Sequence, residues 1–398
     1  MKFAHMADVH IGGWREPKLR ETCTQAFCKA VDMCITERVN FILISGDLFN
    51  TSMPPIDQLR TVVLKLRELQ QAQIPVYSIP GSHDFSASGK TMLDVLASAG
   101  LMTNVATGEY HNEKLRLNTI HDPKTGIHIT GMIGKKGGLE KMYYPYLDYE
   151  HLNAIPSPKI FLFHSAITEL KPEDLSMIDA LPASFLPPGF DYYAGGHVHV
   201  VDHANLDMRN NIVFPGPLFP NNFSELEKLR HGGFYLVENW KPTYTPVILY
   251  PTTPITINCH HKKPIDIPNL IKDELKSLDC TNHIITIRFE GTIKGKIGDI
   301  PFTIITDTLY SAGVYLVLKN TTKLVSPEFE QVSVQTGTLD QIEERVIVEN
   351  TGKSNLFTHK EEQTVVKNLL HTLDTEKHEG ETQTRFEQRI LETCKDFI

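Results

Sequence analysis

The sequence predicts an α/β fold in which two β-sheets pack as a sandwich flanked by helices, followed by a small α+β domain and a C-terminal helical tail. Over residues 2–98, strand-like apolar runs alternate three times with amphipathic segments, which is typical of layered folds with right-handed crossovers. Short strand-like runs without intervening helices follow, up to residue 237. The helical tail is predicted from two apolar stripes at helical spacing near the C-terminus.

The first part of the chain supplies the alternating elements. The run Phe41-Ile-Leu-Ile is a short strand buried on both faces, and it ends at Ser45-Gly46, where a ligand can approach the backbone closely. Residues 55–72 carry apolar side chains at helical spacing. The predicted elements are strands at 2–8, 41–44 and 75–79 and helices at 20–38, 55–72 and 91–98.

A second sheet and two further domains are predicted after residue 105. Gly, Pro and Asn turns separate six short strands at 127–133, 159–164, 191–194, 198–203, 212–214 and 233–237. Residues 243–264 are rich in Pro and Thr and mark a boundary. The predicted division is 1–245 for the sandwich domain, 250–322 for a small capping domain, 323–340 for a polar linker and 341–398 for a helical tail.

Composition limits the class of protein. A chain of 398 residues, 41% of them hydrophobic, can bury the cores of two or three domains. Six cysteines without a Cys-x-x-Cys pair are expected to be buried thiols. The net charge of −9 argues against a generic nucleic-acid binder, although more than half of this acidic excess lies in residues 340–398. No apolar run reaches membrane-spanning length, so we expect a cytosolic protein without a membrane partner.

Five predicted strand ends carry polar side chains that can bind a metal ion. They present Asp8 and His10, then Asp47, then Ser82 and His83, then His164, and finally His197 and His199. Ligands bind at the carboxyl ends of strands in open α/β sheets. Imidazole and carboxylate groups without cysteine suit manganese, iron or zinc. These ligands are too many for one ion, and they fit two divalent ions with Asp47 as the bridging carboxylate.

Each of these signals is weak when taken alone. An Asp at a strand end is usually a turn residue or a helix cap, and 18 histidines make chance His-x-His pairs common. The order Asp-x-His, Gly-Asp, Gly-x-His-Asp, His and Gly-His-x-His, each after a strand-like run, is hard to obtain by chance.

That order resembles the calcineurin-like metallophosphoesterase superfamily over residues 1–240. Residues 80–101 and the motif Phe214-Pro-Gly-Pro-Leu are similar to the SbcD-type nuclease subunit of the double-strand-break repair complex. The chain resembles an archaeal member of that family. The resemblance implies that one metal is held by Asp8, His10, Asp47 and His199, and the other by Asp47, Ser82, His164 and His197. It also implies that His83 protonates the leaving oxygen.

One position departs from the family pattern, which has Asn where this chain has Ser82. A serine hydroxyl reaches less far than an amide oxygen, so we expect the second metal to be held more loosely or through water.

The resemblance further implies a manganese-dependent 3′-to-5′ exonuclease and endonuclease that is a cytoplasmic, nucleoid-associated homodimer. The capping domain would bind DNA, and the basic loop at Lys135 and Lys136 could contact phosphates or be a solvated turn. The tail would grip the coiled-coil base of an SMC-like ABC ATPase. Its predicted contact residues are Val365, Leu369, Phe386 and Ile390.

The residues themselves indicate only a phosphoesterase site. A phosphoprotein phosphatase or a cyclic-nucleotide phosphodiesterase would use the same core, but neither needs residues 250–398. A non-catalytic scaffold without metals is the third alternative, and Ser82 is its only support.

Overall fold

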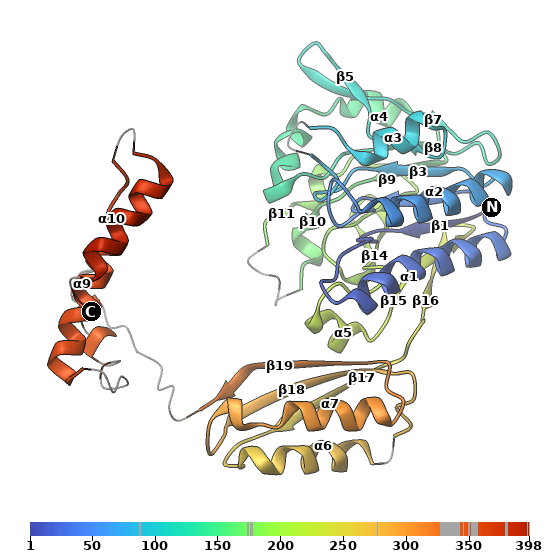
Figure 1. The fold of residues 1–398 in the computed structure, drawn as a ribbon. Coiled ribbons are helices and arrows are strands. Elements are labelled where there is room, and N and C mark those ends of the chain that lie inside the picture. The colour runs from blue at the N-terminus through green and yellow to red at the C-terminus, as the bar shows by residue number, and fades with distance from the viewer. Residues whose placement is uncertain are drawn as a thin grey trace. The chain divides into compact units, whose positions relative to one another are not determined.

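The computed structural model describes residues 1–86, 89–172, 175, 178–276, 278–326, 343–344, 346–348, 351, 357–378, 381–395 and 397 (Figure 1). The chain divides into two compact units, residues 1–325 and residues 326–398.

The first sheet of the larger unit has the strand order β16-β15-β1-β2-β3-β4. Strands β1 to β4 are parallel, and β15 and β16 extend the sheet in antiparallel pairing. Figure 1 shows α1 and α2 along one face of this sheet. The bounds are β1 Lys2–Met6, β2 Ile42–Ser45, β3 Val76–Ile79, β4 Thr103–Asn104, β15 Gly232–Glu238, β16 Lys241–Val247, α1 Pro17–Thr36, α2 Ile56–Gln71 and α3 Met92–Ser98.

The second sheet has the strand order β13-β14-β12-β9-β8-β7 and packs against the first. Strands β8, β9, β12 and β14 are parallel, whereas β7 and β13 pair antiparallel at the two edges. The bounds are β7 Ile120–His121, β8 His128–Gly131, β9 Lys159–Leu162, β12 Tyr192–Ala194, β13 Val201–Leu206 and β14 Arg209–Pro215.

The first three residues of strand β2, Ile42–Ile44, are all apolar because both faces of the strand are covered. Ile42 and Ile44 pack in the core under the helices, whereas Leu43 packs between the two sheets. Successive side chains of a strand point to opposite faces, so a strand covered on both sides needs apolar residues at every position. The predicted sandwich with outer helices is confirmed. The strand predicted at 233–237 is wrongly placed in the second sheet, because as β15 it pairs antiparallel with β1 in the first sheet.

Shorter elements surround the sandwich. They are the hairpin β5 Gly108–His111 with β6 Lys114–Leu117, the pair β10 Ala166–Ile167 with β11 Ala180–Leu181, the helices α4 Tyr149–Ala154 and α5 Phe223–Leu229, and the 3₁₀ turns η1 Lys136–Met142, η2 Tyr144–Tyr146, η3 Thr168–Leu170 and η5 Ala183–Phe185.

The strand predicted at 198–203 begins only at Val201. His197 and His199 have φ values of 94° and 49°, which lie outside the extended region that a regular strand requires. This segment is therefore the turn that follows β12.

A separate three-stranded parallel sheet, β17-β18-β19, follows the sandwich and has its own apolar core. Helices α6 and α7 lie along one face of this sheet (Figure 1). The bounds are β17 Thr252–Asn258, β18 Ile284–Thr292, β19 Leu316–Val325, α6 Ile267–Leu275, α7 Phe302–Ser311, η6 Pro264–Asp266 and η7 Ile297–Asp299.

Two expectations for this region are wrong in detail. The Pro- and Thr-rich segment 243–264 is not only a boundary, because it contains most of β16 and all of β17. Edge strands accept proline, and β16 is an edge strand. Residues 323–325 belong to β19 and not to a linker, and most of the predicted linker lies outside the described residues.

The smaller unit contains the two predicted tail helices, α9 His359–Leu373 and α10 Gln383–Lys395. A capping box between Thr358 and Glu361 starts α9. The predicted contact residues Val365, Leu369, Phe386 and Ile390 are half-buried. More exposed apolar side chains in these helices are Leu370, Leu373 and Leu391.

Among the described residues, no helix is both long and apolar enough to cross a membrane.

Candidate metal centre

The loops that follow the central strands adopt a backbone that L-residues rarely take. The φ values are 49° at Asp8, 46° at His10, 53° at Asp47, 94° at His197 and 49° at His199. Non-glycine residues in this region cost free energy, and they cluster at functional sites where the surrounding structure enforces them. Five of the eight residues predicted for the site therefore have a backbone with positive φ.

Two of these loops are joined by backbone hydrogen bonds. The amides of Asp8, His10 and Ile11 donate to the carbonyls of Gly46, Asp47 and Leu48 at 3.2, 3.0 and 3.1 Å, respectively. These hydrogen bonds join the loops that follow β1 and β2 and hold the backbones of Asp8 and Asp47 relative to each other.

Gly46 allows a histidine from the other sheet to approach. Its φ is 88°, and a Cβ there would lie 2.3 Å from His164 Nδ1. A side chain at this position would collide with His164, so only glycine fits between the two sheets.

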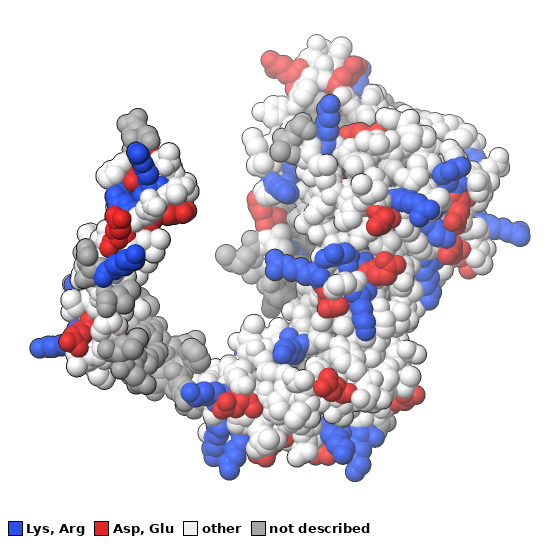
Figure 2. Space-filling model, viewed as in Figure 1, with Lys and Arg blue, Asp and Glu red and all other residues white. Residues whose placement is uncertain are grey.

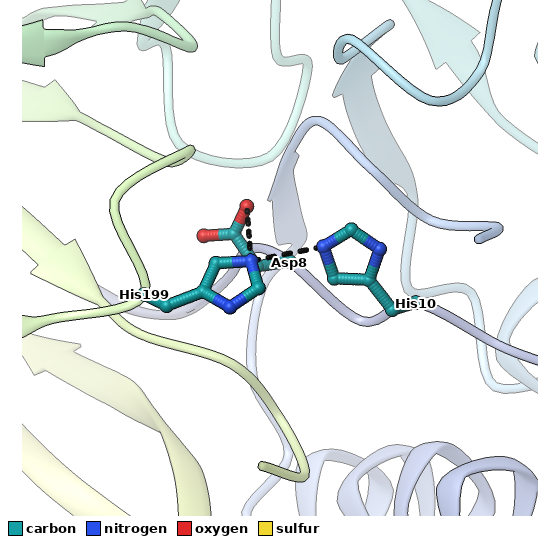
Figure 3. A group of neighbouring side chains, drawn as sticks. All are labelled: Asp8, His10 and His199. Atoms are coloured by element: carbon teal, nitrogen blue, oxygen red, sulfur yellow. Dashed lines mark hydrogen bonds and ion pairs between the residues drawn. The ribbon is translucent and has the colours of Figure 1, made fainter. Parts of the chain in front are cut away.

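A first group of side chains brings Asp8, His10 and His199 together (Figure 3). His10 Nε2 lies 3.0 Å from His199 Nε2, and His199 Nε2 lies 3.8 Å from Asp8 Oδ1. His10 Nε2 is also 3.7 Å from Asp47 Oδ2. The two imidazoles enter from different loops and point toward each other.

A second group surrounds Asp47. His164 Nε2 lies 3.2 Å from Asp47 Oδ2, and Ser82 Oγ donates to the same oxygen at 3.3 Å. The rings of His164 and His197 are 5.1 Å apart. Asp47 therefore stands between the two groups, and the structure brings the seven residues predicted as ligands to one place.

His83 lies at the exposed rim of this place. Its Nδ1 is 2.9 Å from the carbonyl oxygen of Asn50, and its ring lies 4.9 Å from that of His10. Its backbone amide donates to Asp47 Oδ1 at 2.8 Å. One ring nitrogen of His83 also lies within 4.8 Å of potential ligand atoms of His10 and Asp47. His83 is therefore close enough to be a metal ligand, although the sequence analysis assigned it to neither metal.

Burial and neighbouring charges shift the pKa values in opposite directions. Burial alone would raise the pKa of Asp47, but the charge of His164 and its hydrogen bond lower it well below the usual range. Burial would lower the pKa of His164, whereas Asp47 raises it to about 10. Burial lowers the pKa of His10 well below its usual value and raises that of Asp8. Asp47 is thus held as a carboxylate and His10 as a neutral imidazole, whereas His164 holds a proton that a bound cation would have to displace.

The donor set fits divalent cations. The buried His10 Nδ1 has no hydrogen-bond partner among the described residues, and its Nε2 faces another imidazole nitrogen. Carboxylate oxygens, imidazole nitrogens and a hydroxyl converge without any thiolate, which suits manganese, iron or zinc.

Three supporting residues were not identified from the sequence. The buried Asp84 accepts from the amides of Gly81 and Asp47 at 2.8 and 3.0 Å, and so holds the Asp47 loop. The Ser45 carbonyl lies 2.8 Å from His164 Nδ1. Glu225 Oε1 lies 2.9 Å from His199 Nδ1. Only Asp84 had a signal, its place in Gly-Ser-His-Asp, whereas Glu225 is 26 residues from the histidine it contacts.

The loop with Lys135 and Lys136 borders the cluster through Gly134, where a Cβ would lie 2.5 Å from His164 Cδ2. Lys135 Nζ donates to Tyr143 Oη at 2.6 Å, while Lys136 is exposed. Contact of either lysine with phosphate stays a prediction.

Comparison with known proteins gives the following relatives. The family model for calcineurin-like phosphoesterases matches residues 1–201. The chain is 28% identical over 271 residues to the DNA double-strand break repair protein Mre11 of Archaeoglobus fulgidus, covering 62% of this chain and 59% of the relative. It is 30% identical over 253 residues to the Mre11 protein of Methanococcus maripaludis, with 59% and 62% covered. It is 25% identical over 271 residues to the SbcD subunit of the Escherichia coli nuclease SbcCD, with 61% and 66% covered. The matches thus span about three-fifths of the length of these relatives.

Proposed function

The chain belongs to the calcineurin-like phosphoesterase family, and we propose that it is a two-metal-dependent DNA nuclease acting in double-strand-break repair. The observation that carries the proposal is the convergence of Asp8, Asp47 and His164 with the other predicted ligands at the carboxyl ends of parallel strands. The relatives named as double-strand-break repair proteins and as a nuclease subunit support this substrate class.

In this proposal, one divalent ion is held by Asp8, His10, Asp47 and His199, and the other by Asp47, Ser82, His164 and His197. Asp47 is the shared ligand because its Oδ2 is within 3.7 Å of ligand atoms from both sets. Manganese is the proposed ion.

When bound, such a pair of ions supplies a hydroxide from water and neutralises the charge that builds up on a phosphoryl group. The protein's own part is to hold the ligands rigidly, and the paired loops of Asp8 and Asp47 do this. His83 is the general acid for the 3′ oxygen that leaves.

The surroundings of His83 suit that role. Its Nδ1–H donates to the carbonyl of Asn50 at 2.9 Å, which fixes the orientation of the ring and directs Nε2 away from that carbonyl. Its side chain is exposed, so a DNA backbone can reach it.

We further propose 3′-to-5′ exonuclease and endonuclease activity, a homodimer, DNA contact through residues 250–322, and binding of an SMC-like ABC ATPase through the tail helices. On the face in Figure 2, Lys and Arg side chains are interspersed with Asp and Glu, without a broad area of one sign.

The test is a manganese titration with three substrates: a 3′-labelled DNA duplex, a phosphoprotein and a cyclic nucleotide. We expect hydrolysis of the duplex alone, its loss with a chelator and its return with manganese. Hydrolysis of the phosphoprotein or the cyclic nucleotide instead would assign the chain to another activity of the same fold. Binding of metal without any hydrolysis would favour a scaffold.

A further inference from the structure

The short helix α5 lies between the candidate metal centre and the three-stranded sheet, and it contacts both. It has seven residues, Phe223–Leu229, and it buries Leu226 in the core under the helices of the sandwich. A helix of this length has little stability of its own, so its position depends on what it packs against.

On the side of the metal centre, α5 holds His199 through Glu225. Glu225 Oε1 lies 2.9 Å from His199 Nδ1, and its Oε2 accepts from the amide of Asn221 at 2.7 Å. With the proton of His199 fixed on Nδ1, the lone pair of Nε2 is directed toward His10 and Asp8. A carboxylate behind a ligating histidine orients the ring and typically changes metal affinity by 10- to 100-fold.

On the other side, α5 is held by Arg288 of β18. The guanidinium donates through Nε to both carboxylate oxygens of Glu227, at 3.0 and 3.1 Å, and lies 5.3 Å from the ring centroid of Phe223. The side chains of Arg288 and Glu227 are only 15% and 18% exposed. This shielding makes the pair a stronger anchor than an exposed ion pair would be.

Helix α5 therefore links Arg288, which binds Glu227, to His199, which contacts Glu225. We propose that Glu225 is a positioning residue for His199, and that Arg288, by anchoring α5, sets how strongly the metal position at His199 binds its ion. Movement of β18 against the sandwich then changes the affinity of this position and not that of the position at His164. This inference rests on the proposed function, because it requires that His199 is a metal ligand.

Manganese binding to the full chain, measured by calorimetry, tests the inference without reference to activity. We expect Glu225→Gln to weaken one of the two binding events by about 10-fold or more. Arg288→Ala should weaken the same event by a smaller factor, and Arg288→Lys should restore part of the loss. Lys323→Ala is the matched control, because it breaks an exposed pair with Glu290 on the same sheet, 3.1 Å in length, and should change neither affinity.

The combination of Glu225→Gln with Arg288→Ala decides whether the two residues act in series. If Arg288 acts through Glu225, the double variant loses no more affinity than Glu225→Gln alone. Additive losses, or unchanged affinities in a folded Arg288→Ala protein, would overturn the inference while leaving the proposed function intact. If the unchanged protein binds no manganese, the proposed function fails and the inference fails with it. Circular dichroism of each variant shows whether a lost affinity reflects unfolding.

Discussion

The sandwich and the three-stranded sheet both contain parallel strands flanked by helices, yet their strand ends differ. In the sandwich, β1 and β2 lead into Asp8 and Asp47, which have left-handed backbones. In the smaller sheet, β17 and β18 are followed by Cys259 and Ile293, which are buried in an apolar core. Among the described residues, side-chain groups with metal-ligand geometry occur in the sandwich and not in residues 251–325.

The difference shows that parallel strands alone do not make a metal site. In the sandwich, the loops of two facing sheets meet, so Asp47 from the first sheet reaches His164 from the second. The smaller sheet is covered by helices on one face, and the described residues place no second sheet opposite its strand ends. The following predictions test whether the two regions differ in function as they differ in geometry.

The largest effect is expected from Asp47→Asn. Removing the charge of the shared carboxylate should weaken binding of both ions by more than about 100-fold. Loss of a residue that only supports a ligand already weakens metal binding by about 10- to 100-fold, and loss of the ligand's own charge should weaken it further. Calorimetry with manganese measures this loss, and nuclease activity should fall to background. Glu290→Gln, at the end of β18, is the control and should leave both affinities unchanged. Retention of two tight ions by the Asp47 variant would refute the shared site.

His83→Ala should abolish most hydrolysis while both ions stay bound. Loss of a general acid typically lowers the rate by about 10²- to 10⁴-fold. Single-turnover cleavage of the duplex measures the rate, and metal analysis of the purified variant measures occupancy. Loss of an ion together with the activity would make His83 a ligand, as its proximity to His10 and Asp47 allows.

Gly46→Ala tests how closely the two sheets must approach. The φ of 88° and the 2.3 Å approach of a Cβ to His164 Nδ1 should lower the free energy of unfolding by about 1–3 kcal/mol and weaken manganese binding. Gly100→Ala is the control, because that glycine also has a positive φ but its Cβ would meet open space. Thermal unfolding compares the two, and equal losses of stability would show that crowding at His164 is unimportant.

Ser82→Asn should preserve or strengthen binding of the second ion, because the amide oxygen reaches further than the hydroxyl. The hydroxyl now donates to Asp47 Oδ2 at 3.3 Å. Manganese affinities of Ser82→Asn and Ser82→Ala, measured together, decide its role. If neither change alters either affinity, Ser82 does not contribute to metal binding.

The smallest effect on the metal centre is expected from deletion of residues 340–398, since residues 1–325 form a compact unit. The truncated chain should remain a folded, manganese-dependent nuclease but should no longer co-purify with the ATPase. Exposed Leu370, Leu373 and Leu391 give the tail an apolar surface for such a partner. A truncated protein that unfolds or loses metal-dependent activity would show instead that the tail supports the rest of the chain.

The sandwich and the side chains expected to bind metal could be predicted from the sequence, because both predictions depend on local patterns. The apolar run in β2 and the motifs around Asp8, Asp47 and His199 can be read within a few residues. The strands β16 and β17 were missed because Pro and Thr indicate a boundary locally, whereas pairing with β15 and β18 stabilises these segments as strands.

The residues that support the predicted ligands could not be predicted in this way, because tertiary packing brings them together. Glu225 reaches His199 and Arg288 reaches Glu227 across long separations in the chain, and no local pattern encodes such contacts. The same is true of Gly46, whose missing side chain matters because His164 arrives from the other sheet. Local sequence fixes which chemistry a strand end can present, but the packing of one sheet on another fixes the distances at which that chemistry operates.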